Sequence, residues 1–429
     1  MIYILFLSLI IVFFIAYVIN KKDIFAPACI FIGSFIFSAF WACLYANEWE
    51  LQDMHINTFL VILLGCIDFL IFTVITSIIK NRKKTFINDN KLQIIKIQNF
   101  WKILILVICI ITVLWTAISL LKFTGLRWNK IFDAINLYKE DNTFSNVEGL
   151  QFPKVLKGLR ITVSALGYYF IYVSINNYLV KREIDFKNLL IVFLTMISSI
   201  ESGGRSTLIN QILVAIMIYV ILLRKKNGKF RVIKFKQMIK IFLLGVIILL
   251  CFQKSLVLMG RKTYSTPVYY IAYYCGAEIK NLDLYLQNRY NSNNIVGSQT
   301  FINLIRWFGK KIGYENYYYT LDLPFRSVGN LNLGNVYTTF YAYIYDFGYF
   351  GEFILVALMA FMAQSFYIRA NKKNNYMYVL IYAYMFSGIS MSFFSNRFYE
   401  QIFNLNFVYF VILWYLMNYF LVKVKLKIK

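Results

Sequence analysis

Long apolar runs that follow one another along the whole chain constrain this protein more than any other feature of its sequence. A helix of about 20 mostly apolar residues is long enough to cross the hydrocarbon core of a bilayer. About eleven runs approach that length: residues 2–19, 25–46, 56–79, 103–121, 160–180, 187–200, 206–223, 239–259, 349–368, 376–394 and 402–422. We therefore expect an all-α polytopic membrane protein. No repeat or low-complexity linker divides residues 1–429, which predicts a single membrane domain.

Composition and charge support the lipid bilayer as the main partner of the chain. Hydrophobic residues make up 60% of the sequence and charged residues 15%, while the net charge is +25. The basic residues lie in short clusters between apolar runs, such as residues 81–84 and 224–226. Such clusters face the anionic surface of a membrane and set its topology, so a nucleic-acid partner is disfavoured. The single His55 and the lack of CxxC or HExxH spacing predict no metal site and no metal cofactor.

The distribution of Lys and Arg predicts an orientation. When the runs are placed in alternation, the basic loops fall on one side: residues 20–24, 80–102, 181–187, 224–240, 369–375 and 423–429. The opposite short loops, 47–55, 201–206 and 395–401, contain only Arg205 and Arg397 as basic residues. The positive-inside rule then predicts an external N-terminus and a cytoplasmic C-terminus. A twelfth span near 335–348 is the alternative, and it would move two basic segments to the wrong side.

Two long loops, 122–159 and 260–348, are external in this topology. The larger one contains a predicted amphipathic helix, which Ser265 or Thr266 would cap and Pro267 would start. Its apolar face follows spacings of three and four residues: Val268, Ile271, Cys275, Ile279, Leu282 and Leu286. Such a helix lies on the membrane surface or covers a cavity, and we expect segment 260–348 to form a helical cap.

A polar turn between residues 200 and 207 separates two apolar runs and is a candidate anion site. Residues 188–200 are short for a span, so the Gly203-Gly204-Arg205 turn lies near the depth of the external headgroups. Ser206 or Thr207 would cap the next helix, and its free amides beside Arg205 suit a phosphate or diphosphate. A tight turn with an interfacial arginine is the structural alternative.

External arginines form a second set of candidates. Arg397 sits in a short turn between two spans, where an unused charge is unexpected. It is a candidate ligand for an anion, and an ion pair with Glu400 at helical spacing is the alternative. Arg261 begins the larger external loop.

Acidic residues supply the candidate bases. Asp346 lies between aromatic residues at the mouth of a span, where it would act as a partly desolvated base or cap the following helix. Glu278 is another acid of the external loop. Asp68 lies in the middle of a span, at a cost of about 2.5 to 3.5 kcal/mol unless it is partnered, and its structural alternative is a role in packing.

Three motifs resemble those of the oligosaccharide repeat-unit polymerases, the Wzy-type O-antigen and capsule polymerases. They are Glu201-Ser202-Gly203-Gly204-Arg205-Ser206, Asn335-Val336-Tyr337-Thr338 with Asp346-Phe347-Gly348, and Ser395-Asn396-Arg397-Phe398. The resemblance implies a GT-C-like glycosyltransferase of the bacterial cytoplasmic membrane. Such an enzyme joins polyprenyl-diphosphate-linked repeat units on the outer face, without a nucleotide sugar or a metal cofactor, into O-antigen or capsule.

The resemblance also assigns roles. Arg205 would bind the diphosphate, together with Gly203, Gly204 and Ser206, and Arg397 and Arg261 would contribute to the same pocket. Related ligases use an external histidine, whereas His55 stands alone here, so a carboxylate such as Asp346 or Glu278 would act as the base. The implied partners are lipid-linked glycans and the flippase and chain-length regulator of the pathway. A lipid-linked oligosaccharide flippase and a glycan ligase are the alternative functions.

Overall fold

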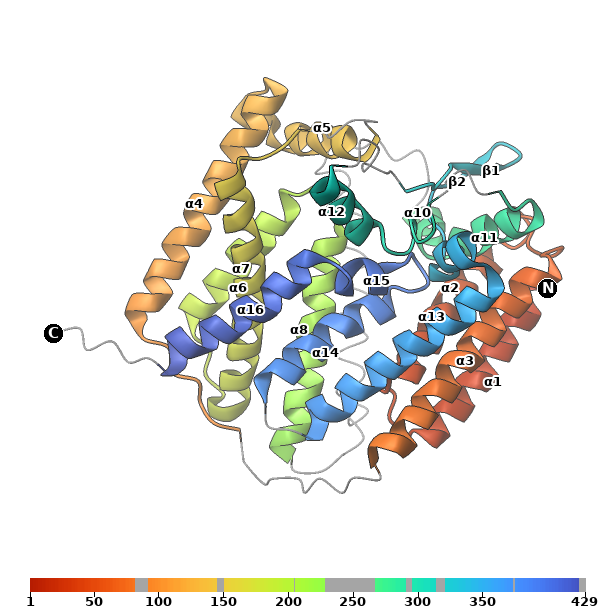
Figure 1. The fold of residues 1–429 in the computed structure, drawn as a ribbon, viewed down its shortest axis with the longest axis horizontal. Helices are drawn as coiled ribbons and strands as arrows, with labels where there is room; N and C mark the ends of the chain where they lie inside the picture. The colour runs from red at the N-terminus through yellow and green to blue at the C-terminus, as the bar shows by residue number, and fades with distance from the viewer. Residues whose placement is uncertain are drawn as a thin grey trace. The chain divides into compact units, whose positions relative to one another are not determined.

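The structure, a computed structural model, describes residues 1–81, 92–144, 150–203, 205–227, 267–290, 295–313, 321–372 and 375–423. This part of the chain is mostly helical, with one short strand pair (Figure 1). Eight of its helices are long and apolar enough to cross a membrane. They are α1 (Ile2–Ile19), α2 (Pro27–Leu44), α3 (Ile56–Asn81), α4 (Asn99–Thr124), α6 (Lys154–Lys181), α8 (Arg205–Asn227), α13 (Thr339–Lys372) and α16 (Leu405–Asn418), which a π-helical turn, η2 (Tyr419–Lys423), extends.

Each of these eight helices overlaps one of the predicted apolar runs. Two further runs form the shorter apolar helices α7 (Phe186–Ile200) and α14 (Tyr376–Ser390). The run at 239–259 lies outside the described residues. The all-α, multi-pass membrane class agrees with this structure, while the number of spans stays a prediction.

The chain divides into two compact units. Unit 1 contains residues Met1–Phe86, Tyr264–Lys372 and Met385–Asn404, and unit 2 contains Ile87–Thr263, Lys373–Tyr384 and Leu405–Lys429. Because each unit is built from three separate segments, the division does not correspond to one boundary along the sequence.

Unit 1 is built around the packing of α13 on α3, with α1 and α2 beside α3 (Figure 1). Aromatic rings fill the contact. The Phe31 and Phe69 rings stack with centroids 4.2 Å apart, and the Phe35 and Phe340 rings lie 5.0 Å apart. All four side chains are buried. Burial of rings of this size dominates the stability of a helix contact.

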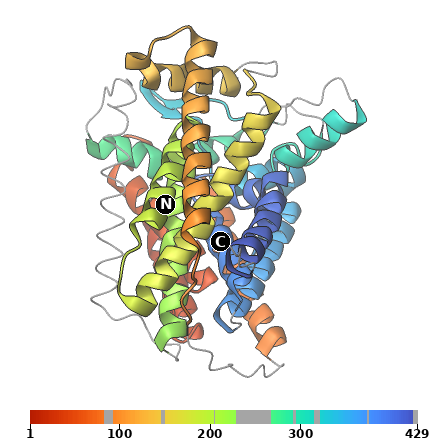
Figure 2. The ribbon, with the colours of Figure 1, turned by 90° about the vertical axis from the view of Figure 1, so that its left-hand side faces the viewer.

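Unit 2 is built around α6, which packs on α7, α8 and α16. The Trp414 indole of α16 donates a hydrogen bond to the Ala165 carbonyl of α6, over 3.0 Å. In the loop predicted at 122–159, a turn of 3-10 helix, η1 (Trp128–Lys130), leads into α5 (Ile131–Phe144). Helix α5 lies across the end of α4, as Figures 1 and 2 both show. A small apolar cluster around Leu120, Ile135 and Phe152 holds this end together.

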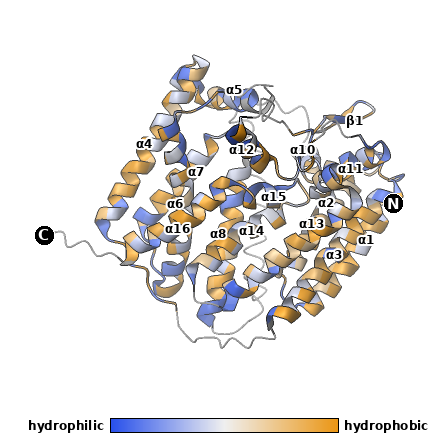
Figure 3. Ribbon diagram, in the orientation of Figure 1, coloured by the Kyte–Doolittle hydropathy of each residue, from blue (hydrophilic) through white to orange (hydrophobic). Residues whose placement is uncertain are grey.

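The segment predicted as a helical cap at 260–348 contains three helices and a hairpin in its described part. Helices α10 (Pro267–Cys275), α11 (Ala277–Gln287) and α12 (Ile302–Ile312) are followed by strands β1 (Arg326–Val328) and β2 (Leu331–Gly334), which pair antiparallel. Figure 3 shows hydrophilic residues on α11 and α12, whereas α1, α3 and α4 are hydrophobic along most of their lengths.

The prediction of one amphipathic helix through residues 267–286 is wrong in two respects. The helix breaks at Gly276, where a side chain would lie 2.7 Å from the Ala42 backbone nitrogen of α2. Helix α11 is buried on almost all sides, including Glu278, Lys280 and Asp283. Both differences arise from close packing against α2 and α3. The proposed caps, Ser265 and Thr266, lie outside the described residues.

Helix α13 begins ten residues before the predicted run at 349–368. Its backbone is helical from Thr339, and the helix kinks at Gly348, where φ is 70° and ψ is −170°. Residues 335–348 therefore do not form a separate twelfth span in this structure, because 339–347 continue into the same helix across the kink.

Candidate active site

The turn between α7 and α8 in unit 2 carries the predicted Gly203-Gly204-Arg205 motif. Helix α7 is short, as expected, and Asp185 caps its first turn by accepting hydrogen bonds from the amides of Lys187 and Asn188. Three backbone hydrogen bonds shape the turn at the other end, from Glu201 to Ile197, Ser202 to Ser199 and Gly203 to Ile200. The turn is therefore held by its own backbone.

Gly203 is required by the geometry of this turn. Its φ of +71° lies in the left-handed region, and a side chain there would come within 2.7 Å of Cβ of Lys139 in α5. The glycine thus lets the turn pack directly against α5.

The predicted cap of α8 is corrected by the structure. Helix α8 begins at Arg205, so Ser206 lies inside its first turn and is not the cap. The Thr207 hydroxyl donates to the Ser199 carbonyl over 3.3 Å. The residue before the helix, Gly204, and the side chain of Arg205 lie outside the described part of the structure. Their predicted contribution to a diphosphate site stays a prediction.

Glu201 is the residue of this turn that the sequence motif leaves without a role. Its side chain is buried, at 5% exposure, and its Oε2 atom has no hydrogen-bond partner among the described residues. Burial raises the pKa of the Glu201 carboxyl to about 8, and the positive charge of Arg160 opposes that shift. A carboxyl group that titrates near neutral pH suits proton transfer.

Arg160 of α6 supplies the positive charge beside this carboxyl. Its guanidinium lies 4.6 Å from the centre of the Phe152 ring, and its Nη1 atom has no hydrogen-bond partner among the described residues. No ion pair within 4.0 Å joins Arg160 to Glu201 in the described part of the chain. The positive charge of Arg160 therefore acts on the Glu201 carboxyl without such an ion pair, and one polar atom of each side chain has no hydrogen-bond partner among the described residues.

The sequence alone does not indicate that Arg160 and Glu201 interact. The available signal is that Arg160 opens the apolar run 160–180 and that Glu201 is the only acid between two adjacent runs. Their separation along the chain hides the electrostatic interaction, which depends on the packing of α6 on α7 and α8.

Arg397, the second predicted arginine, lies in unit 1 at the start of the short helix α15 (Arg397–Ile402). Its Nη1 atom lies 3.3 Å from Glu400 Oε2, which confirms the alternative of an ion pair at helical spacing. Burial raises the pKa of Glu400, while the charges of Arg397 and Arg306 oppose the shift. The Asn396 amide anchors the turn by donating to the carbonyls of Gln299 and Thr300.

Asp346 of unit 1 has a structural role. Its carboxylate accepts hydrogen bonds from the backbone amides of Gln299 and Thr300, at 3.1 and 2.6 Å. It therefore holds the segment before α12. The predicted alternative, in which Asp346 caps the helix that follows Gly348, is wrong. Because amide donors already occupy the carboxylate, Asp346 is a weaker candidate base than its position in the sequence suggested.

Glu278, the other predicted base, is fully buried in α11 of unit 1. Neither of its carboxyl oxygens has a hydrogen-bond partner among the described residues, and burial raises its pKa well above the ordinary range. Arg261 lies outside the described residues. The single pocket predicted for Arg205, Arg397 and Arg261 stays a prediction, because these residues belong to different units or to undescribed segments.

The likeness to repeat-unit polymerases rests on the three motifs alone. No protein-family model matches the chain, and no curated protein or solved structure is significantly similar to it.

Proposed function

We propose that this protein polymerises polyprenyl-diphosphate-linked oligosaccharide repeat units into a surface polysaccharide, on the outer face of the bacterial cytoplasmic membrane. One observation carries the proposal. The turn between α7 and α8 combines a buried carboxyl, Glu201, a neighbouring guanidinium, Arg160, and the first turn of α8. These are the groups that transfer of a glycan from a diphosphate requires.

In the proposed reaction, a hydroxyl oxygen of the acceptor unit attacks the anomeric carbon of the donor glycan. The bond between that carbon and the diphosphate oxygen breaks, and polyprenyl diphosphate leaves with the electron pair. The hydroxyl proton passes to the ionised form of Glu201. Arginine charge and the amides at the start of α8 stabilise the negative charge that develops on the leaving group.

Glu201 replaces Asp346 and Glu278 as our preferred base. The Asp346 carboxylate already accepts two amide hydrogen bonds. Glu278 is buried in α11, most of whose residues are also buried. Glu201 shares its turn with the predicted diphosphate motif, and its pKa of about 8 leaves an ionised fraction available near neutral pH.

The outer-face location follows from the predicted topology, which puts the turn at 201–206 outside. The multi-pass helical architecture supports a membrane-embedded substrate. Polymerisation also accounts for the three motifs that resemble those of the repeat-unit polymerases, and it requires no metal or nucleotide-sugar cofactor.

Deletion of the gene tests the proposal directly, with the surface polysaccharide analysed on a gel. We expect loss of the ladder of chain lengths while single repeats are still attached. Loss of even the single repeats would indicate a flippase instead, and accumulation of full-length unattached chains would indicate a ligase.

Complementation with variants then tests the site. We expect Glu201→Gln and Arg205→Ala each to lower chain extension by a factor of about 100 or more while the protein remains in the membrane. Arg127→Ala is the matched control, because Arg127 is an exposed arginine of the predicted external loop in the same unit. Normal ladders with both site variants would contradict the assignment of the site.

A further inference from the structure

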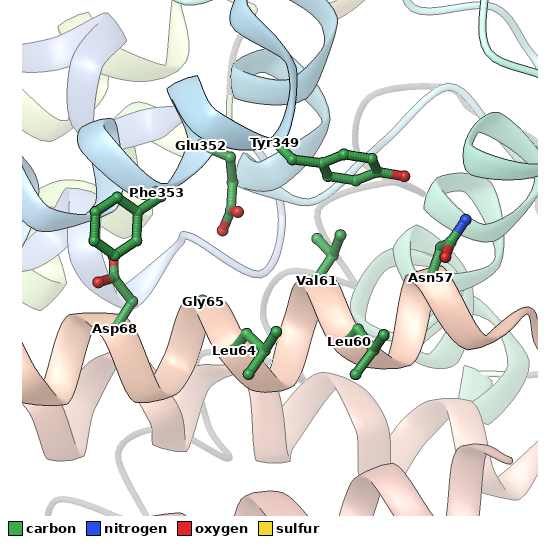
Figure 4. Close-up of a pocket in the computed structure, with 9 residues that line it drawn as sticks. All are labelled: Asn57, Leu60, Val61, Leu64, Gly65, Asp68, Tyr349, Glu352 and Phe353. Carbon is green, nitrogen blue, oxygen red and sulfur yellow. The ribbon is translucent and has the colours of Figure 1, made fainter.

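A pocket in unit 1, separate from the proposed active site, contains two acidic side chains without a visible partner. It has a volume of about 350 Å³ and is lined by α3 and α13 (Figure 4). Asp68 comes from α3 and Glu352 from α13, and the two exposures are 7% and 8%. Most of the other lining residues are apolar: Leu60, Val61, Leu64, Gly65 and Phe353, with Asn57 and Tyr349 as the polar exceptions.

The two carboxyl groups are unpaired in the part of the chain that the structure describes. Asp68 Oδ2 and Glu352 Oε1 are buried atoms without a hydrogen-bond partner. No described residue forms an ion pair with either side chain. The charge of Asp68 nevertheless acts on Glu352, so the two groups belong to one electrostatic site.

Gly65 makes room on the surface of α3 for both the Phe340 ring and the Glu352 carboxylate. A side chain at Gly65 would lie 2.5 Å from the Phe340 ring and 2.8 Å from Glu352 Oε1. Figure 4 shows Glu352 directed from α13 toward α3 above Gly65. The site is therefore shaped so that a carboxylate of one helix reaches the backbone of the other.

The depth of the site makes two negative charges there costly. From Asn57, near the predicted external end of α3, to Asp68 the helix rises about 17 Å, close to half the thickness of a membrane. Insertion scales place the cost of a single charge at that depth at about 2.5 to 3.5 kcal/mol. A positive charge shared by the two carboxylates would remove most of this cost.

None of the described helices that pack on this pair supplies that positive charge. Helices α1 and α2 contain no Lys or Arg. On α11, Lys280 is 3.5 Å from Asp283 and is thereby paired. Lys80 of α3 lies about 18 Å further along the helix, over the Phe361 ring. Arg289 stacks on the Tyr349 ring at 4.7 Å. The charge of Glu352 also acts on the Cys66 thiol and on the Tyr343 phenol, and neither group becomes a cation.

We propose that Asp68 and Glu352 together bind one monovalent cation, either a proton or an alkali-metal ion, within the membrane region of unit 1. The inference rests on the geometry of α3 and α13 and is independent of the proposed polymerase activity. It gives the protein a cation site in addition to its proposed glycan chemistry.

The test uses dicyclohexylcarbodiimide, which modifies protonated carboxyl groups in apolar surroundings. The purified full-length protein in detergent is treated over a range of pH, and mass spectrometry measures modification of Asp68 and Glu352. We expect the rate of modification to fall about tenfold for each pH unit above its midpoint. In Asp68→Asn, the midpoint for Glu352 should move to lower pH by about one unit, because the neutral amide no longer repels the Glu352 charge.

Glu352→Gln provides the reciprocal measurement, the pH midpoint for modification of Asp68. The proposal can therefore still be tested if one of the two variants does not fold. Asp53→Asn is the matched control, because Asp53 is an exposed acid of the same unit. It should leave the modification unchanged. Protection by sodium chloride relative to choline chloride identifies an alkali-metal ion, whereas equal modification in both salts identifies a proton. Absence of modification at every pH, or unchanged midpoints in both variants, overturns the proposal.

Discussion

A buried carboxyl group such as that of Glu201 makes the stability of its surroundings depend on pH. Burial raises the pKa of this group from an ordinary value of 4.5 to about 8, so the folded state holds the proton more tightly than the unfolded state does. The contribution of the protonated Glu201 carboxyl to the stability of the folded state is then fully present below a pH of about 4.5 and is lost as the pH rises through about 8.

Replacement of Glu201 by Gln should remove this dependence. As the pH rises between the two pKa values, the free energy of unfolding of the wild-type protein should fall by up to about 1.4 kcal/mol for each pH unit. The fall should be much smaller for Glu201→Gln. Thermal unfolding in detergent, followed by tryptophan fluorescence at a series of pH values, measures the difference. Glu183→Gln is the control, because the Glu183 side chain is 77% exposed. An unchanged pH dependence in Glu201→Gln would show that the carboxyl is not buried.

At the scale of single elements, the kink in α13 lies at Gly348, where the predicted external segment ends. Gly348 adopts φ 70° and ψ −170°, a combination that essentially only glycine visits. Apart from its chain neighbours and the backbone of its own helix, no described residue has an atom within 4 Å of the position that a side chain would take there. Any loss of stability in a variant at Gly348 therefore comes from the backbone and not from a steric clash.

We expect Gly348→Ala to destabilise the protein by about 1 to 3 kcal/mol. Gly33→Ala is the matched control within unit 1, because a side chain there would meet Phe13 at 3.6 Å, an ordinary contact, in a normal helix. Gly33→Ala should change the free energy of unfolding by no more than about 1 kcal/mol. Unfolding by heat in the same detergent compares the two variants, and equal stability would argue that α13 is straight.

At the scale of the whole molecule, the orientation in the membrane determines which face can carry out the proposed chemistry. The positive-inside pattern predicts that Asp53 is outside and Glu183 is in the cytoplasm. Both residues are exposed. The described native cysteines give a low background, because Cys29, Cys66, Cys109 and Cys275 are buried and Cys43 is half-buried.

A membrane-impermeant maleimide tests this orientation in intact cells. Asp53→Cys should be labelled from outside, and Glu183→Cys should be labelled only after the cells are permeabilised. The wild-type protein measures the background. The reverse pattern would place the turn at 201–206 in the cytoplasm, which is incompatible with polymerisation on the outer face.

Local properties of the sequence determined most of the helices. A long apolar run buries its backbone hydrogen bonds within one helix, so the runs at 2–19, 56–79 and 206–223 predicted α1, α3 and α8 without knowledge of their neighbours. The ion pair between Arg397 and Glu400 was also predictable, because its partners lie three positions apart on one helix.

Only the tertiary structure decided the features that depend on contacts between distant segments. The break at Gly276 follows from the approach of α2, and the presence of Asp68 and Glu352 in one pocket follows from the packing of α13 on α3. The proximity of Arg160 to Glu201 likewise requires α6 to pack beside α7 and α8. The sequence by itself determined a helical membrane protein, because hydrophobic length acts within one segment. Side-chain partners depend on how separate segments meet, and packing alone decides that.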